Sequence, residues 1–130
     1  MRPSVEASIN SRPAGRASIM IVDDDAGLLA ALRFAFEAEG LIVDAFSSAE
    51  AALGANLSPH NCLVVDQRLP GLSGLDLLER LRQRGETAPA LLITSNPGAI
   101  VRARARAAGV EIVEKPLLQD VLTRRVLQLV

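Results

Sequence analysis

One stretch decides the fold of this chain: CLVVDQRLPG, at residues 62–71. Its first four residues are an unbroken apolar run followed by turn-forming residues, which is typical of a strand buried on both faces. Asp66 comes directly after this run, at the predicted carboxyl end of the strand, where open parallel sheets bind their ligands. Because Asp is also a common turn residue, Asp66 alone is equally well explained as the start of a turn.

Strand and helix patterns alternate along the rest of the chain. Such alternation is typical of a parallel sheet with helices on both faces, joined by right-handed crossovers. The first, third and fourth strand patterns are continuously apolar, so we place them in the centre of the sheet. The sequence therefore predicts an α/β fold, a flavodoxin-like doubly wound five-stranded parallel sheet with strand order 2-1-3-4-5. The predicted strands are 19–22, 41–46, 62–65, 90–94 and 110–113, and the predicted helices are 28–39, 47–53, 73–84, 98 to about 108, and 117 to the end.

Two serines mark expected helix starts. Ser47 with Glu50, and Ser73 with Asp76, each fit a capping box, in which the two side chains bond to each other's backbone N–H groups. Asp76 also stands four residues before Arg80, a spacing that favours an ion pair along the helix surface. We therefore expect both helices to begin at these serines.

Length and composition fit one soluble globular domain. The chain has 130 residues, of which 49% are hydrophobic and 22% charged, enough for a single buried core. Residues 1–17 are poor in apolar side chains and show no periodicity. We therefore expect a flexible N-terminal tail, followed by one domain at residues 18–130.

The net charge and the single cysteine indicate which partners and which cellular compartment to expect. A net charge of −1 gives no electrostatic reason to bind nucleic acid or an anionic membrane, and no stretch is long and apolar enough to span a bilayer. The single cysteine, Cys62, lies in an apolar run, which favours a core thiol in a reducing compartment. We interpret His60, just before it, as a loop histidine. A cytoplasmic protein is expected.

In the predicted fold, polar residues that follow four strands meet at the carboxyl edge of the sheet: Asp23 and Asp24, Asp66, Thr94, and Lys115. Crowded carboxylates repel one another unless a cation neutralises them, and Mg²⁺ suits a small set of carboxylate oxygens because it keeps several waters. The lysine adds positive charge and the threonine a hydroxyl donor. A carboxylate nucleophile that attacks a phosphoryl donor needs this set. Each residue alone could be structural: the acidic cluster a solvated loop, Thr94 a cap at a strand end, and Lys115 a surface charge. Because all of them follow strands, we favour a phosphoryl-transfer site.

These residues stand in motifs that resemble a known family, the receiver domain of bacterial two-component response regulators. The resemblance covers about residues 18–130. The motifs are VDDD at 22–25, LVVD at 63–66 with LPG at 69–71 and Gly74 behind it, LITS at 92–95, and EKP at 114–116.

The resemblance implies a phosphoacceptor that is not an enzyme, apart from slow self-dephosphorylation. Asp66 would accept a phosphoryl group from a histidine kinase or phosphotransfer protein, and Thr94 and Lys115 would contact the phosphoryl oxygens. The Lys115–Pro116 bond would be cis. The implied ligands of Mg²⁺ are Asp24, Asp23 through a water, the Asp66 side chain and the backbone carbonyl of Arg68.

Three positions depart from the family pattern or vary within it. Ile112 stands where relatives often carry an aromatic residue that rotates on activation. Arg68 and Asn96 lie where relatives vary the rate of dephosphorylation. The Arg68 side chain either shields the aspartyl phosphate or points to solvent.

The sequence leaves open how this chain would act on other molecules once it is phosphorylated. Because the sequence shows no helix-turn-helix pattern, we expect this chain to bind no nucleic acid. It is either a stand-alone receiver or the receiver fragment of a longer DNA-binding regulator, and a phosphorylation-independent binding module of the same fold is a further alternative. A hydrolase with an aspartyl-phosphate intermediate is disfavoured, because such enzymes commonly carry a second Asp two residues after the nucleophile, where this chain has Arg68. A flavin-binding module is disfavoured because the three aspartates after the first strand would repel the phosphate of the flavin.

The last helix carries more apolar residues than one buried stripe needs. The excess predicts a homodimer or partner contact through the face formed by residues 98–130, strengthened by phosphorylation; the alternative is that a downstream segment covers it. Those expected to face the sheet are Leu118, Val121, Leu122 and Leu129, and those expected to stay exposed are Leu127 with Val126 or Val130.

Overall fold

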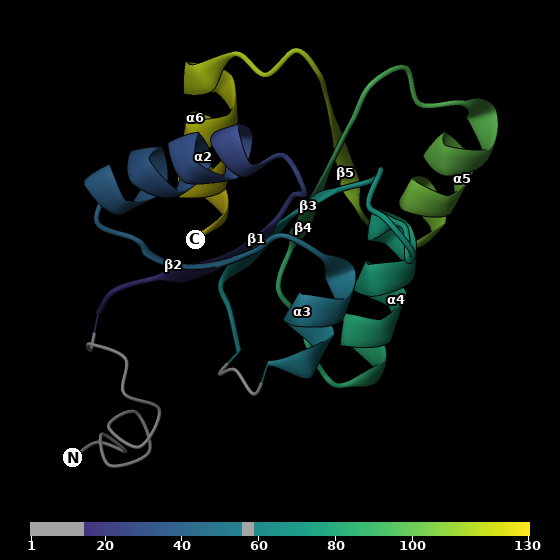
Figure 1. The fold of residues 1–130 in the computed structure, drawn as a ribbon, viewed down its shortest axis with the longest axis horizontal. Coiled ribbons are helices and arrows are strands. Elements are labelled where there is room, and N and C mark those ends of the chain that lie inside the picture. Colours follow the sequence, from purple (N-terminus) through teal and green to yellow (C-terminus); the bar gives the residue numbers. More distant parts are fainter. Residues whose placement is uncertain (1–14, 56–58) are drawn as a thin grey trace.

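The computed structural model describes residues 15–55 and 59–130, and their fold confirms the predicted architecture. Five parallel strands form one sheet in the order β2-β1-β3-β4-β5 (Figure 1). The three central strands are the three with continuously apolar runs, and every residue in them is buried. The strands are β1 (Ser18–Val22), β2 (Ile42–Phe46), β3 (Cys62–Asp66), β4 (Ala90–Thr94) and β5 (Glu111–Glu114).

Helices cover both faces of the sheet, as predicted (Figure 1). Helices α2 (Ala26–Ala38) and α6 (Gln119–Leu129) pack on one face, and α3 (Ala49–Gly54), α4 (Gly74–Gln83) and α5 (Ala99–Ala107) pack on the other. Successive side chains of a strand point to opposite faces. In β3, therefore, Val64 packs under α2 and α6, whereas Leu63 and Val65 pack under the other three helices.

One predicted helix start is wrong by one residue. Helix α3 is capped by Ser48, whose Oγ accepts a hydrogen bond from the backbone N–H of Ala51 at 3.0 Å. Ser48 is in the extended backbone conformation that an N-cap requires, so Ser47 lies outside the helix.

The second capping box is confirmed. Asp76 N–H donates to Ser73 Oγ at 3.1 Å, and Ser73 N–H donates to Asp76 Oδ2 at 3.3 Å. Asp76 does not pair with Arg80 as predicted. Its Oδ1 lies 3.3 Å from Arg104 of α5, so the ion pair joins two helices instead of two turns of one helix.

The predicted buried stripe of the last helix is partly wrong. Leu122 and Val126 are buried against the sheet, and Leu129 packs against the same cluster, as predicted for Leu122 and Leu129. Leu118 and Val121 are 67% and 48% exposed instead. Leu127 and Val130 are exposed, as predicted.

The segments that connect the elements bear on three further predictions. Residues 1–14 of the expected tail lie outside the described residues, whereas Arg16 and Ala17 already hydrogen-bond to the chain around Gly40 and Ile42. His60 is a buried loop residue whose ring nitrogens lie between carboxylates of β2 and of the segment after α4. None of the described helices has the length and apolar character needed to cross a membrane.

Candidate functional site

The carboxyl edge of the sheet brings the predicted site residues together. Asp23 follows β1 directly, Asp66 is the last residue of β3, Thr94 is the last residue of β4, and Lys115 follows β5. Because all strands are parallel, these ends lie on one edge, and Asp24 joins them from the loop that enters α2. Residues that are far apart in the sequence thus form one cluster.

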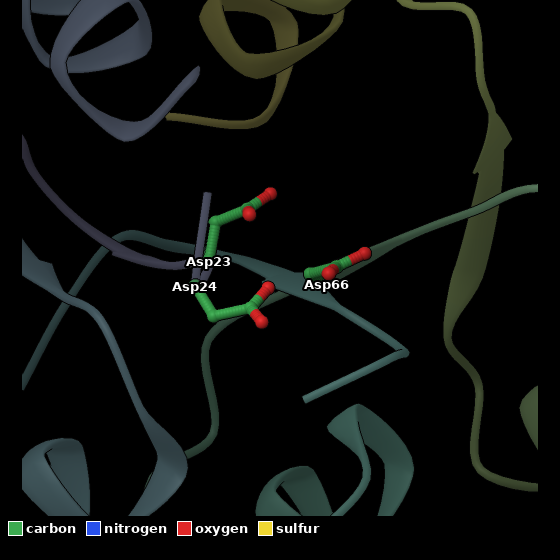
Figure 2. Close-up of side chains that lie close together, drawn as sticks. All are labelled: Asp23, Asp24 and Asp66. Carbon is green, nitrogen blue, oxygen red and sulfur yellow. The ribbon is translucent and has the colours of Figure 1, made fainter. Parts of the chain in front are cut away.

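Three carboxylates dominate this cluster. Oxygen atoms of Asp23, Asp24 and Asp66 all lie within 4.8 Å of one another, grouped at the ends of β1 and β3 (Figure 2). Asp23 and Asp66 are 1% and 4% exposed, whereas Asp24 faces solvent. Clustered oxygen ligands of this kind suit a hard divalent cation such as Mg²⁺.

The side chain of Asp23 carries an unsatisfied polar atom. Its Oδ1 accepts a hydrogen bond from the backbone N–H of Asp25 at 2.9 Å. Its Oδ2 is buried and has no hydrogen-bond partner among the described residues. Burial raises the pKa of Asp23, the Asp25 N–H lowers it, and the charge of Asp66 raises it again. A buried carboxylate oxygen without a partner is costly, so a cation beside Asp23 would remove a real energetic penalty.

Asp66 has a cationic neighbour on the side of β5. Nζ of Lys115 lies 3.3 Å from Oδ1 of Asp66. Burial raises the pKa of Asp66, and the charge and hydrogen bond of Lys115 lower it in part. The result is a largely buried carboxylate with one cation in contact, which is the environment of a nucleophile that must approach an anionic group.

Two glycines shape the loop behind Asp66. A Cβ at Gly74 would collide with the carbonyl oxygen of Asp66 and would lie 2.9 Å from Cα of Gln67, so only glycine allows α4 to start this close to the site. Gly71 has a positive φ of 77°, which other residues rarely adopt. Gln67 also fixes the loop, because its Oε1 accepts a hydrogen bond from the N–H of Leu75 at 2.9 Å.

The remaining predicted residues are placed as follows. Thr94 is buried, and its carbonyl oxygen accepts a hydrogen bond from the Lys115 N–H at 2.9 Å, which joins the ends of β4 and β5. The Lys115–Pro116 bond is cis, as predicted. Ile112 is half-buried. Arg68 is exposed, and in the described part of the chain its side chain forms no ion pair within 4.0 Å, which favours the solvent-facing alternative.

Two further residues, Gln67 and Asp25, hold the site in shape and were not among the predicted site residues. Gln67 carried no recognisable signal, because its role depends on a contact with α4. Asp25 was counted only as part of an acidic run, yet it caps α2 by accepting from the N–H of Leu28 at 3.1 Å and donates its own N–H to Asp23. Its position before an apolar helical repeat was a usable N-cap signal.

A five-stranded parallel sheet with an acidic cluster at its carboxyl edge is the architecture of a signalling receiver domain. The chain belongs to the response regulator receiver domain family, whose model matches residues 19–127. It is therefore a receiver domain of a two-component system.

Sequence relatives and solved structures agree with this family. The response regulator protein TodT of Pseudomonas putida is 37% identical over 110 residues, 82% of this chain and 48% of the relative. The transcriptional regulatory protein FixJ of Bradyrhizobium diazoefficiens is 36% identical over 108 residues, 81% of this chain and 52% of the relative. The chain thus spans about half the length of the curated relatives it matches. A receiver domain crystal structure from Methanospirillum hungatei shares the fold, with a TM-score of 0.81 at 24% identity over 88% of this chain and 93% of that one.

Proposed function

We propose that Asp66 accepts a phosphoryl group from a histidine kinase or a phosphotransfer protein, in a reaction that requires Mg²⁺. The observation that carries this proposal is the contact of Lys115 with Asp66 beside a cluster of three carboxylates. In this arrangement one carboxylate is paired with a cation, while Asp23 and Asp24 are left to hold a metal. The chain acts as a phosphoacceptor, with no catalytic turnover of its own beyond slow loss of the phosphoryl group.

The reaction follows from the positions of these side chains. An Asp66 carboxylate oxygen attacks the phosphorus, the bond from phosphorus to the donor breaks, and the donor leaves with its electron pair. Lys115 pairs with an oxygen of the transferred group, and the Thr94 hydroxyl donates to another. Asp24, Asp66, the backbone carbonyl of Arg68, and Asp23 through a water would hold Mg²⁺. When bound, Mg²⁺ neutralises charge on the transferring group.

We propose that phosphorylation changes how the face at residues 98–130 binds a partner or a second copy of the chain. Ile100 on α5 is 79% exposed, and Leu118, the N-cap of α6, and Val121 of α6 are also exposed. The same stretch of chain holds two ion pairs that join a helix to β5: Arg102 of α5 with Glu114, and Arg125 of α6 with Glu111. Exposed apolar side chains together with charges of both signs are typical of a protein interface, which supports this proposal.

Two broader features of the function are also proposals. The match covers only about half of each of these relatives, which supports a receiver that regulates an attached or separate output domain. The buried, free thiol of Cys62 supports a reducing, cytoplasmic site of action. A phosphorylation-independent binding module is the second candidate, and it predicts an edge that responds to no phosphoryl mimic.

Beryllofluoride, a phosphoryl mimic, tests the proposed site without a kinase. The chain has no Trp or Tyr, so amide NMR spectra are a better readout than fluorescence. We expect Mg²⁺ alone to shift amides around Asp66, and beryllofluoride with Mg²⁺ to shift in addition amides at the ends of β4 and β5, which neither reagent alone should do. Asp66→Asn is the control and should show no response. A wild-type spectrum that stays unchanged would support the phosphorylation-independent module.

A further inference from the structure

Helices α4 and α5 leave an open groove of about 630 Å³ between them, on the face of the sheet that they share with α3. Its lining is mostly apolar and includes Leu75 and Leu78 of α4 and Val110 at the start of β5. Ala107 and Ala108 line the α5 side. This volume lies within the range of protein clefts that bind a ligand or a partner side chain.

The sequence of α5 causes the groove. The helix reads AIVRARARA, and Ala105 is its one buried residue. Where two helices carry leucines on facing sides, their side chains fill the space between the axes. At 107 and 108 the side chain is a single methyl group, so α5 leaves a hollow beside Leu75 and Leu78, whose own side chains are buried.

The two helices that flank this groove carry an excess of positive charge. Helix α4 with its C-cap Arg84, together with α5, carries six arginines and two acidic residues, a net charge of +4 in a chain whose total is −1. Arg104 pairs with Asp76, and Arg102 pairs with Glu114. In the described residues the other four arginines of this set form no ion pair within 4.0 Å: Arg80, Arg82, Arg84 and Arg106.

We propose that this groove docks an acidic amphipathic segment of a partner protein. An apolar side chain of the segment enters between α4 and α5, and carboxylates beside it pair with Arg82 and Arg104, the two arginines that line the groove. The positive surround disfavours a basic segment, and the apolar lining matches an aliphatic or aromatic anchor better than a nucleic acid backbone. None of these residues belongs to the cluster around Asp66, so the proposal stands independently of phosphorylation.

Glu79 sharpens the proposal, because it is the one acidic residue that lines the groove. Within the described residues it forms no ion pair within 4.0 Å. Its carboxylate therefore repels an acidic segment while Arg82 attracts it. Removing these two charges in turn should change the affinity in opposite directions.

Synthetic peptides test the groove directly. The probe is a helix-forming peptide with leucines on one face and glutamates on the other, titrated into the full chain and followed by amide NMR. We expect saturable shifts at Leu78, Ala107 and Val110. Matched peptides with Lys in place of Glu, or Ala in place of Leu, and a single-stranded oligonucleotide should bind more weakly. Equal or tighter binding by any of these three would overturn the proposal.

Variants of the protein locate the contact. Arg82→Gln should weaken the Leu–Glu peptide by about two- to fivefold, which is the effect of one exposed ion pair, and Glu79→Gln should tighten it. Arg106→Gln is the matched control, because it removes the same charge from a residue outside the groove lining. Ala107→Leu should block binding by filling the groove. If Arg82→Gln and Arg106→Gln weakened binding of the Leu–Glu peptide equally, general charge attraction would explain the binding, and this would contradict a docking site in the groove.

Discussion

Lys115 reaches across β4 to place its Nζ 3.3 Å from Oδ1 of Asp66, the residue that ends β3. This contact needs β3, β4 and β5 to be aligned, because the two residues belong to strands that are not neighbours in the sheet. The Lys115 N–H also donates to the Thr94 carbonyl oxygen at 2.9 Å, which fixes the start of the loop after β5. The contact between Lys115 and Asp66 can therefore form only when these three strands are paired in the sheet.

Loss of the Lys115 charge should raise the pKa of Asp66. Burial already raises this pKa, and Lys115 is the largest influence that lowers it. In Lys115→Met the carboxylate would therefore take up its proton at a higher pH than in the wild type. Carbon-detected NMR of the Asp66 carboxyl group measures this directly. The control is Arg106→Met, which removes a cation at the end of α5 and should leave the pKa of Asp66 unchanged. An unchanged titration of Asp66 in Lys115→Met would show that the contact between the two side chains does not persist in solution.

Asp24→Ala should weaken Mg²⁺ binding without loss of stability in the metal-free state. Burial is the main cause of the raised pKa values of Asp23 and Asp66, and the nearby charge of Asp24 adds to both. Removal of this exposed carboxylate relieves repulsion, so the melting temperature without metal should stay equal or rise. Calorimetric Mg²⁺ titration and melting by circular dichroism test the two parts. Normal Mg²⁺ affinity with a clear drop in stability would assign Asp24 a structural role.

Gly74→Ala should destabilise the fold by about 1–3 kcal/mol, the usual cost of overpacking. Its new methyl group would collide with the Asp66 carbonyl oxygen and approach a Leu92 methyl to 2.9 Å. Gly54→Ala is the matched control: nothing lies within 4 Å of the added methyl in α3, and the change should stabilise by about 0.4–1 kcal/mol. Urea unfolding of both variants gives the comparison. Similar effects at both positions would contradict the tight approach of α4 to the site.

The Cys62 thiol should be unreactive in the folded protein. It is fully buried, and burial is the main cause that raises its pKa from 9.0 to about 11. At pH 8 the thiolate, which is the reactive form, is therefore scarce as well as inaccessible. Iodoacetamide should label the chain only after denaturant is added, as read by intact mass. Rapid labelling without denaturant would show that β3 opens readily at its amino end.

The sheet and its order followed from the sequence because apolar runs and helical repeats alternate without ambiguity. The site followed for the same reason: Asp23, Asp66 and Thr94 each come at the end of an apolar strand. Parallel strands bring such positions together whatever the details of the helices.

The predictions failed where a local pattern had two readings. Ser47 and Ser48 are both good N-caps, and the difference between them depends on which one has the extended backbone. The stripe of α6 was misassigned because its many leucines and valines fit more than one register; the sheet selects Leu122 and Val126. The pairing of Asp76 with Arg104 depends on how two helices cross, which no local spacing reveals.

The most direct test of the central claim is the intact mass of the protein after incubation with acetyl phosphate. With Mg²⁺ present, the wild type should gain the mass of one phosphoryl group, and chelation of the metal should prevent the gain. Asp66→Asn should gain none under the same conditions while remaining folded by circular dichroism. Phosphorylation of the Asp66→Asn variant at the wild-type rate, or no phosphorylation of the wild type at all, would contradict the assignment of Asp66 as the acceptor.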